Sequence, residues 1–234
     1  MNEQFNIIKM KKILSLLIAL VISVSIFAQD AEVRDLREFD RVIVYDGITV
    51  QLVPSDKYSV KVSGAYIDKM STQVSGNTLK IKMNFGSSFK GEDNHVIVYY
   101  DNKLYEIKAC EGSSITSNEV IKADNLILSS KEGADIDLKI KAKDLTSKSY
   151  TGGNINVEGK TKNSFVEVYT GGKFDGIKLE AQYGEVKVNA GGRAEVTVED
   201  VLDASVTMGG NIYYYGKTKS VNQSVSLGGK IESR

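Results

Sequence analysis

The stretch VYTGGKFDGIKLE at residues 168–180 places a Gly-Gly pair between two short runs in which apolar and polar side chains alternate. A single stretch of this kind indicates two strands joined by a turn. Variants of it stand before and after it, as SYTGGNINVEG, VNAGGRAEVTVED, VTMGGNIYYYG and VSLGGKIESR. A short motif that recurs at a nearly fixed distance is typical of a solenoid, in which each copy forms one coil.

The glycine pairs set the length of the repeat. Seven glycines begin a Gly-Gly, Gly-Ser or Gly-Ala pair, and the steps between them are 21, 19, 19, 20, 18 and 19 residues. These glycines are Gly112, Gly133, Gly152, Gly171, Gly191, Gly209 and Gly228. The second glycines of the complete pairs are Gly153, Gly172, Gly192, Gly210 and Gly229. From Gly133 onward we interpret all of them as structural, because the chain must bend sharply there and a Cβ atom would meet the neighbouring coils.

No segment between the glycine pairs has the period of a helix, so the fold class is all-β. We predict a single-stranded parallel β-helix with about 19–20 residues per coil, right-handed because parallel crossovers almost always are. Strand alternation predicts three inward columns, at three residues before each pair, one residue before it, and two residues after its second glycine. In the coil quoted above these positions hold Val168, Thr170 and Phe174.

Residues 1–28 have the pattern of an export signal. Three lysines precede an almost wholly apolar run at 13–27, and Ala28 stands before polar sequence. The run is shorter than the roughly 20 residues of a spanning helix, so we predict cleavage after Ala28 and no integral membrane segment after that. An uncleaved anchor is the alternative, and a start at Met1 or at Met10 is left open. The pattern places the mature protein in the periplasm, at the outer surface or in the medium.

The rest of the chain, 29–234, is predicted to form one continuous domain. Residues 29–105 contain strand-like runs such as RVIVYDGITVQLV and predict N-terminal strands or a cap, whereas 106–234 hold the glycine-paired coils. The last coil ends at LGGKIESR. An uncovered coil exposes unpaired backbone groups, so we expect a homo-oligomer through this open end as one possible association.

Composition narrows the classes of function. Lys and Arg number 30, as do Asp and Glu, so the formal net charge is zero, which argues against nucleic acid as a partner. The single cysteine, Cys110, excludes an internal disulfide, and the single histidine, His95, has no partner for a triad or a metal cluster. We therefore expect no catalytic residues, no metal site and no cofactor.

Three further stretches carry a resemblance to a known family: FDRVIVYDGITVQLVPSDKYSVKVSG, LYEIKACEGSSI and SKEGADIDL. They resemble the head GIN domain of putative auto-transporter adhesins, a domain of unknown function common in secreted proteins of Bacteroidetes. The resemblance covers residues 36–225. It implies an exported all-β protein with β-helical coils, no established enzyme activity and no known cofactor, and it supplies no catalytic residues.

Two groups of outward residues are candidates for binding. Tyr150 and Tyr169 occupy equivalent positions on adjacent coils, where aligned rings could stack on sugars, enter a protein interface, or simply pack on each other. The second group is a charged set in which an acidic pair and a basic pair fall in two outward columns. It consists of Lys173, Asp175, Arg193 and Glu195. Cross-coil charge pairing is the plainer interpretation of this set, and a cation site is the alternative.

Three functions from different classes remain open. A non-catalytic surface protein would present a rigid face to a glycan or to a cell-surface protein. A polysaccharide-acting enzyme similar to pectate lyases would need the four charged residues to converge in one groove. A periplasmic scaffold or lipid-associated protein would use the apolar columns. The regular outward columns and the lack of a catalytic cluster favour the first, an adhesin-like binding module that is not an enzyme.

Overall fold

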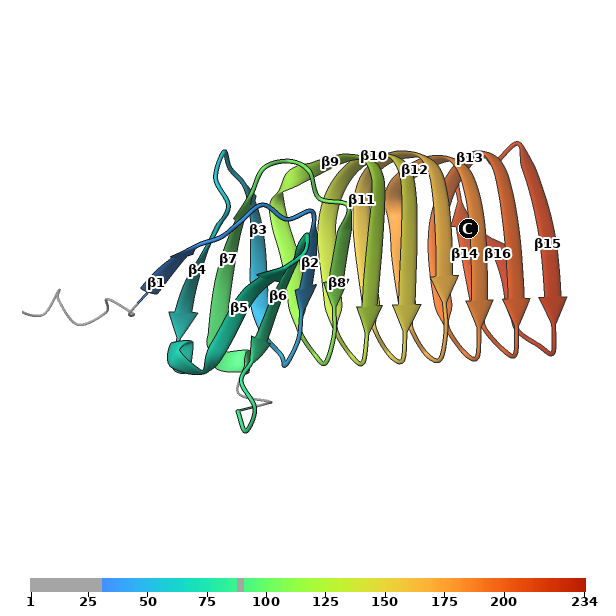
Figure 1. Cartoon of the computed structure of the whole chain (residues 1–234). Helices are drawn as coiled ribbons and strands as arrows, with labels where there is room; N and C mark the ends of the chain where they lie inside the picture. The colour runs from blue at the N-terminus through green and yellow to red at the C-terminus, as the bar shows by residue number, and fades with distance from the viewer. Residues whose placement is uncertain (1–30, 88–90) are drawn as a thin grey trace, which may run out of the picture. The chain divides into compact units, whose positions relative to one another are not determined.

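The computed structural model describes residues 31–87 and 91–234, and the predicted export signal lies outside them (Figure 1). Residues 32–234 form one compact unit. Its described part consists mostly of strands, with two short 3-10 helices, η1 (Ile67–Lys69) and η2 (Gly91–Asp93). The prediction of an all-β solenoid is confirmed.

The central coils are five long strands that pair in parallel, each with the next (Figure 1). They are β9 (Ser114–Lys131), β10 (Asp135–Tyr150), β11 (Asn154–Val168), β12 (Lys173–Asn189) and β13 (Arg193–Thr207). Each strand bends midway, so we call the part that follows a glycine turn the first limb and the part that precedes the next turn the second limb. Between β10 and β11 every register pair is 19 residues apart, as in Asp135↔Asn154 and Ser149↔Val168.

Three shorter strands complete the carboxyl-terminal coils and separate the two limbs. These strands are β14 (Asn211–Tyr215), β15 (Ser220–Ser226) and β16 (Lys230–Ser233). β14 pairs with the first limb of β13 and β15 with its second limb, while β16 pairs with β14. The coil is therefore a flattened loop with a sheet on each side.

The amino-terminal strands extend both sheets and mix parallel with antiparallel pairs. They are β1 (Ala31–Asp35), β2 (Arg41–Val44), β3 (Thr49–Pro54), β4 (Ser59–Gly64), β5 (Met70–Ser75), β6 (Thr78–Met83), β7 (Asn94–Tyr100) and β8 (Glu106–Ala109). β3 joins the first limb of β9 and β8 joins its second limb, both in parallel. β4 with β7 and β5 with β6 are antiparallel.

Each glycine pair lies in a tight turn whose two central residues are left-handed. At Tyr150–Gly153 the φ angles of Thr151 and Gly152 are 47° and 74°, and Gly153 N donates to Tyr150 O at 2.9 Å. Two consecutive positive φ angles define a type I′ turn, which favours glycine at its second central position. The second glycines Gly153, Gly172, Gly192 and Gly210 have an ordinary φ and are buried against the preceding coil, whereas Gly229 in the last turn has a φ of 104° and is exposed.

The prediction that the residue before each glycine pair faces inward is wrong. Thr151 and its equivalents in the next four turns are all exposed, because the left-handed turn interrupts the strand alternation. These equivalents are Thr170, Ala190, Met208 and Leu227. The other two columns are buried in the coils from β11 to β13, for example at Val168 and Phe174.

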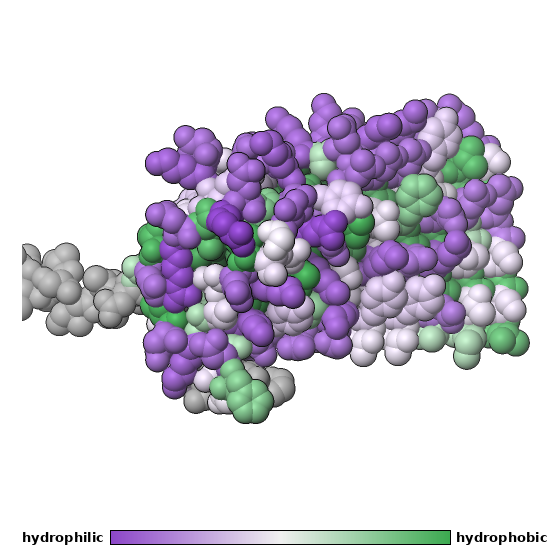
Figure 2. Space-filling view, in the orientation of Figure 1, coloured by the Kyte–Doolittle hydropathy of each residue, from purple (hydrophilic) through white to green (hydrophobic). Residues whose placement is uncertain are grey.

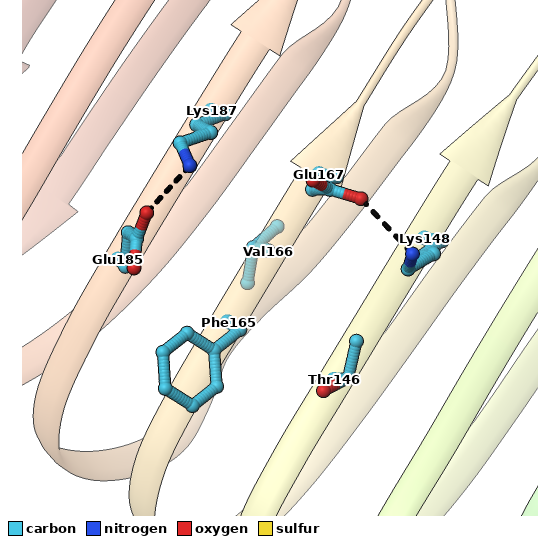
Figure 3. A pocket seen from close by; sticks show the side chains of 7 residues that line it. All are labelled: Thr146, Lys148, Phe165, Val166, Glu167, Glu185 and Lys187. Carbon is cyan, nitrogen blue, oxygen red and sulfur yellow. Dashed lines mark ion pairs between the residues drawn. The ribbon is translucent and has the colours of Figure 1, made fainter.

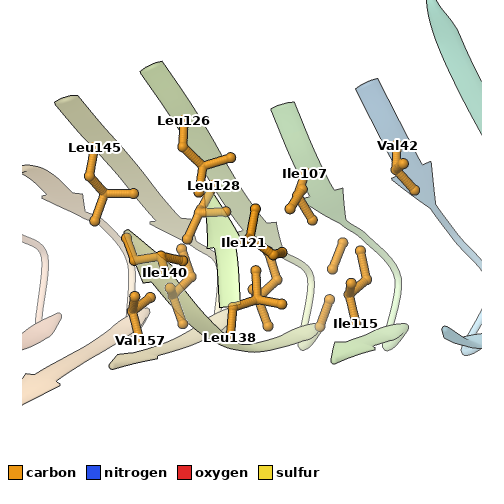
Figure 4. Packing of buried hydrophobic residues seen from close by; sticks show 14 of the residues in the cluster. Val42, Ile107, Ile115, Ile121, Leu126, Leu128, Leu138, Ile140, Leu145 and Val157 are labelled. Atoms are coloured by element: carbon orange, nitrogen blue, oxygen red, sulfur yellow. The ribbon is translucent and has the colours of Figure 1, made fainter. Parts of the chain in front are cut away.

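Apolar rows from successive coils fill the space between the two sheets (Figure 4). On the first limb, Ile115, Ile136 and Ile155 stack in register, and on the second limb Leu126 stacks on Leu145. Unequal repeat lengths are absorbed by bulges in the first limb or at the bend, such as the register shift between Asn156 and Gly159. The second limb of each coil therefore keeps its register with the second limbs of the neighbouring coils.

One inward row contains a hydroxyl that lacks a hydrogen-bond partner. Ser147 is 1% exposed, and its Oγ has none among the described residues. Its neighbour Ser149 is equally buried, but Ser149 Oγ donates to Gly153 O and accepts from Lys173 N at 3.0 Å. A buried polar group without a partner destabilises a fold, whereas a satisfied one stabilises it.

Replacing Ser147 by alanine is therefore expected to leave the free energy of unfolding unchanged or to raise it by about 1 kcal/mol. Ser149→Ala is the matched control and is expected to lower it by about 1 kcal/mol, because the two hydrogen bonds of the buried hydroxyl are lost while Lys173 N keeps its bond to Gly153 O. Equilibrium unfolding in urea measures both. An equal loss of unfolding free energy in the two variants would contradict the assignment of Ser147 as unpartnered.

Candidate functional site

The outer face of the second limb carries a row of side chains that alternation turns away from the core. Thr146, Phe165, Glu185, Asp203 and Asn222 are successive register neighbours on β10, β11, β12, β13 and β15. The row therefore crosses five coils at the spacing of neighbouring strands, about 4.8 Å per step. It places one aromatic ring beside two carboxylates and an amide.

Shallow hollows lie on both sides of this row. One has a volume of about 200 Å³ and lies between Lys148, Phe165, Glu167 and Glu185 (Figure 3). A second is lined by Phe165, Tyr183, Glu185 and Asp203, and a third by Glu185, Asp203 and Asn222 among others. Because all three share Glu185, we treat them as one feature, the second-limb groove. Its two aromatic rings are exposed, Phe165 by 43% and Tyr183 by 39%.

Ion pairs hold the charged side chains of the second-limb groove in place. Lys148 Nζ lies 3.3 Å from Glu167 Oε2 on the next coil, and Lys187 Nζ lies 2.6 Å from Glu185 Oε1 on its own strand (Figure 3). The hydrogen bond that each lysine donates raises the pKa of Lys148 and of Lys187. Both amines are therefore charged at neutral pH.

Amide groups position two further carboxylates near the same face. Asn163 Nδ2 donates to Asp144 Oδ1 at 2.5 Å, and Asn222 Nδ2 donates to Asp203 Oδ1 at 2.7 Å. Each bond joins adjacent coils, so the coil stacking itself aligns donor with acceptor. Each carboxylate keeps acceptor capacity beyond this bond, which suits a ligand rich in hydroxyl groups.

The tyrosines proposed from the sequence do lie side by side. The rings of Tyr150 and Tyr169 are stacked, with centroids 5.4 Å apart and an angle of 15° between their planes. Partial burial raises the pKa of Tyr150. Each ring covers one face of the other, so the pair offers a ligand less ring surface than two separate rings would.

The charged set proposed from the sequence lies on the first limb. Lys173 pairs in register with Arg193, and Asp175 with Glu195. Arg193 donates two hydrogen bonds to Glu195, at 3.2 Å and 3.1 Å, and Tyr215 Oη donates a third at 2.8 Å. Glu195 is therefore committed to its protein neighbours.

The electrostatics of Glu195 do not suit the role of a general acid. Partial burial would raise its pKa, but the hydrogen bonds from Arg193 and Tyr215 outweigh burial and hold that pKa below its ordinary value. A carboxylate of this kind stays ionised at neutral pH and cannot act as a general acid. In the described part of the chain, no group of three or more His, Cys, Asp or Glu side chains could hold a metal ion.

Sequence reasoning missed Phe165 and Tyr183. Both occupy outward positions of the second limb, next to the inward Ser164 and Gly184. Alternation counted backward from the glycine turn would have found Phe165, since Val168 and Val166 are buried and Glu167 and Phe165 are not. The same count finds Tyr183, because Val188, Val186 and Gly184 are buried and Tyr183 is exposed.

The chain has recognisable relatives. The model of the family described as "Putative auto-transporter adhesin, head GIN domain" matches residues 38–218. A search of curated proteins gives no match. No helix in the described residues is long and apolar enough to cross a membrane.

Solved structures share the fold. A putative adhesin from Bacteroides fragilis NCTC 9343 is 18% identical with a TM-score of 0.80, covering 89% of this chain and 98% of that chain. A putative adhesin from Parabacteroides merdae ATCC 43184 is 17% identical with a TM-score of 0.66, covering 89% and 97%. A putative lipid binding protein from Parabacteroides distasonis ATCC 8503 is 19% identical with a TM-score of 0.62, covering 88% and 97%.

Proposed function

Because the chain belongs to the family of the head GIN domain of putative auto-transporter adhesins, we propose that it is an exported, non-catalytic adhesin that binds glycans on the second-limb groove. Membership of this family supports export and a role in binding. The glycan and the groove are inferred from the geometry of the outer face.

The observation that carries the proposal is the pairing of exposed rings with fixed carboxylates. Phe165 and Tyr183 present apolar ring faces at the surface, and Glu185 and Asp203 lie beside them in the same hollow. An aromatic ring packs against the apolar C–H face of a sugar, while carboxylates and amides bind its hydroxyls. A stack of paired strands holds these groups in place before the ligand arrives, which lowers the entropic cost of binding.

The alternatives receive less support from the arrangement of side chains. A polysaccharide-acting enzyme would need Asp175 and Glu195 to share a groove with free basic groups, yet Glu195 is bound by Arg193 and Tyr215. A lipid-associated protein would need an open interior, whereas apolar side chains fill the rows between the two sheets in the described coils.

Replacing both Phe165 and Tyr183 by alanine is expected to weaken glycan binding about tenfold or more, because contact residues of this kind commonly contribute 1–2 kcal/mol. A glycan array probed with the purified protein would identify a ligand, and calorimetry would compare the variants. Both side chains point outward, so the thermal midpoint is expected to change little.

The matched control is Tyr150→Ala/Tyr169→Ala, which removes two rings from the same face outside the groove. Its affinity is expected to stay within about threefold of wild type, because the stacked rings already satisfy each other. Loss of binding in the control but not in the groove variant would move the site to the stacked tyrosines. Absence of any glycan ligand for the wild-type protein would refute the proposal.

A further inference from the structure

Another hollow, separate from the second-limb groove, lies where the two limbs of the coils meet, and its charge is strongly positive. Lys122, Lys141, Lys143 and Lys162 line it together with Asp124, so four lysines and one aspartate give a local charge of +3. The hollow has a volume of about 680 Å³. Hydrophilic side chains gather along this edge of the coils, at the top of Figure 2. We call this hollow the lysine corner.

The coils repeat the positive charge at a regular interval. Lys141 is the register partner of Lys122. Lys143 and Lys162 occupy equivalent positions, because the offset of 19 residues holds on both sides of them, at Ala142↔Thr161 and Asp144↔Asn163. Neighbouring strands are about 4.8 Å apart, so the amines form a short array along the stack. That interval is comparable to the length of one sugar ring.

None of these four lysines forms an ion pair within the described residues, although lysines around them do. Lys139 binds Glu158, Lys148 binds Glu167, and Lys160 binds Glu180. Like charges held side by side on paired strands repel one another. In a chain whose formal net charge is zero, four amines beside one carboxylate in a single hollow are therefore an asymmetry that a bound anion would relieve.

We propose that the lysine corner binds the sulfate, phosphate or carboxylate groups of an anionic glycan. This inference rests on the proposed function, because it takes the partner to be a glycan and specifies its charge. Lys162 precedes Phe165 by three residues on β11, which is about 10 Å along a strand. One chain of sugars can therefore reach from the lysine corner to the second-limb groove.

The array favours a polysaccharide over a nucleic acid. Its cations are lysines, which act as point charges, and among the described residues no arginine lines the hollow to bind a phosphate with two parallel hydrogen bonds. The described lining contains no aromatic ring either, so unpaired bases would find no stacking surface there. A flexible acidic polysaccharide needs only positive charges on the protein that are spaced like its own anionic groups.

The test compares binding of dextran sulfate with binding of uncharged dextran of the same length, using the full chain. Wild-type protein is expected to bind dextran sulfate with an affinity that falls as ionic strength rises. Replacing Lys122, Lys141, Lys143 and Lys162 by glutamine is expected to weaken that binding about tenfold, since each exposed charge contact contributes roughly a factor of two.

The matched control replaces four exposed lysines of the amino-terminal region and removes the same charge. These are Lys57, Lys61, Lys80 and Lys82. The control is expected to bind dextran sulfate within about twofold of wild type. An equal loss in both variants would show a response to net charge alone and overturn the lysine corner as a site. Tighter binding of single-stranded DNA than of dextran sulfate at the same corner would overturn the choice of a glycan.

The groove variant separates this inference from the proposed function. If Phe165→Ala/Tyr183→Ala loses an array glycan while the lysine variant binds dextran sulfate as wild type does, the lysine corner fails and the groove stands. If dextran sulfate binding depends on the four lysines while no array glycan depends on the groove, the groove fails and the charge assignment stands.

Discussion

Gly153→Ala is expected to lower the free energy of unfolding by about 3 kcal/mol, at the upper end of the usual cost of forcing extra atoms into a packed site. A Cβ atom on Gly153 would press into the carbonyl group of Ser130 on the preceding coil and lie 2.8 Å from Lys131 N. Both are backbone atoms in the middle of a stack, so neither can move without displacing a coil. Equilibrium unfolding in urea would measure the loss.

Gly152→Ala is the control, because it changes the adjacent residue of the same turn. A Cβ atom on Gly152 would meet nothing within 4 Å, but its φ angle is 74°. The expected loss of stability then comes only from holding alanine in the left-handed conformation, which costs about 1–2 kcal/mol. The expected order is wild type, then Gly152→Ala, then Gly153→Ala as the least stable. The reverse order would show that backbone conformation outweighs the contact between coils.

The first two coils show that the turn type alone does not require a second glycine. Ser113 and Ala134 occupy the position equivalent to Gly153, and both are fully buried. At Ser113 the hydroxyl is accommodated by hydrogen bonds, since its Oγ donates to Val44 O and accepts from Cys110 N. The expected loss at Gly153 therefore reflects the close approach of Ser130 O and not the turn type.

The repeat in the sequence was sufficient to predict that the coils stack. It was not sufficient to predict, at every position, which side chains face inward. The steps between glycines correctly predicted parallel coils, and adjacent Tyr150 and Tyr169 do stack. The inward assignment of Thr151 failed because alternation was carried through two residues that are left-handed. Alternation assumes an extended backbone on both sides of the residue counted, and a type I′ turn ends it.

The candidate site depended on contacts that a sequence pattern does not contain. The columns correctly placed Asp175 beside Glu195. They could not show that Arg193 would bind Glu195 on its own strand, or that Tyr215 would reach back from the next coil. A repeat length specifies which residues are neighbours, whereas the rotamers of long side chains decide which neighbours bond. Binding by Tyr150 and Tyr169, which the sequence suggested, is untested, and the groove proposal expects it to be absent.

Phe174→Ala is expected to lower the free energy of unfolding by about 4 kcal/mol, the typical loss for a large aromatic side chain in a core. Phe174 is 2% exposed and stacks between Ile155 and Ala194 on the adjacent coils. Alanine would leave a void in the middle of the stack, where coils on both sides prevent its collapse. Urea unfolding with two spectroscopic probes would measure the loss and check that the transition is two-state.

The ring of Phe174 also fills space that other coils fill with a second side chain. Two residues further on, β12 has Gly176, whereas β13 has Val196 at the paired position, and a Cβ atom on Gly176 would lie 2.6 Å from Cε1 of Phe174. One large and one absent side chain in this coil therefore replace the two medium ones of the preceding coil, Ile155 and Val157. Phe174→Ile/Gly176→Val, which divides the volume between both positions, is expected to stay within about 1.5 kcal/mol of wild type.

Gly176→Val alone is expected to lose more than that double variant, because valine would then overlap the phenylalanine ring. The two substitutions should thus be strongly non-additive, as expected for residues in direct contact. Additive losses would mean that the coil relaxes around each change separately. In that case the interior of the solenoid would tolerate insertion of a side chain in a single coil, and the same freedom should reduce the loss expected for Gly153→Ala.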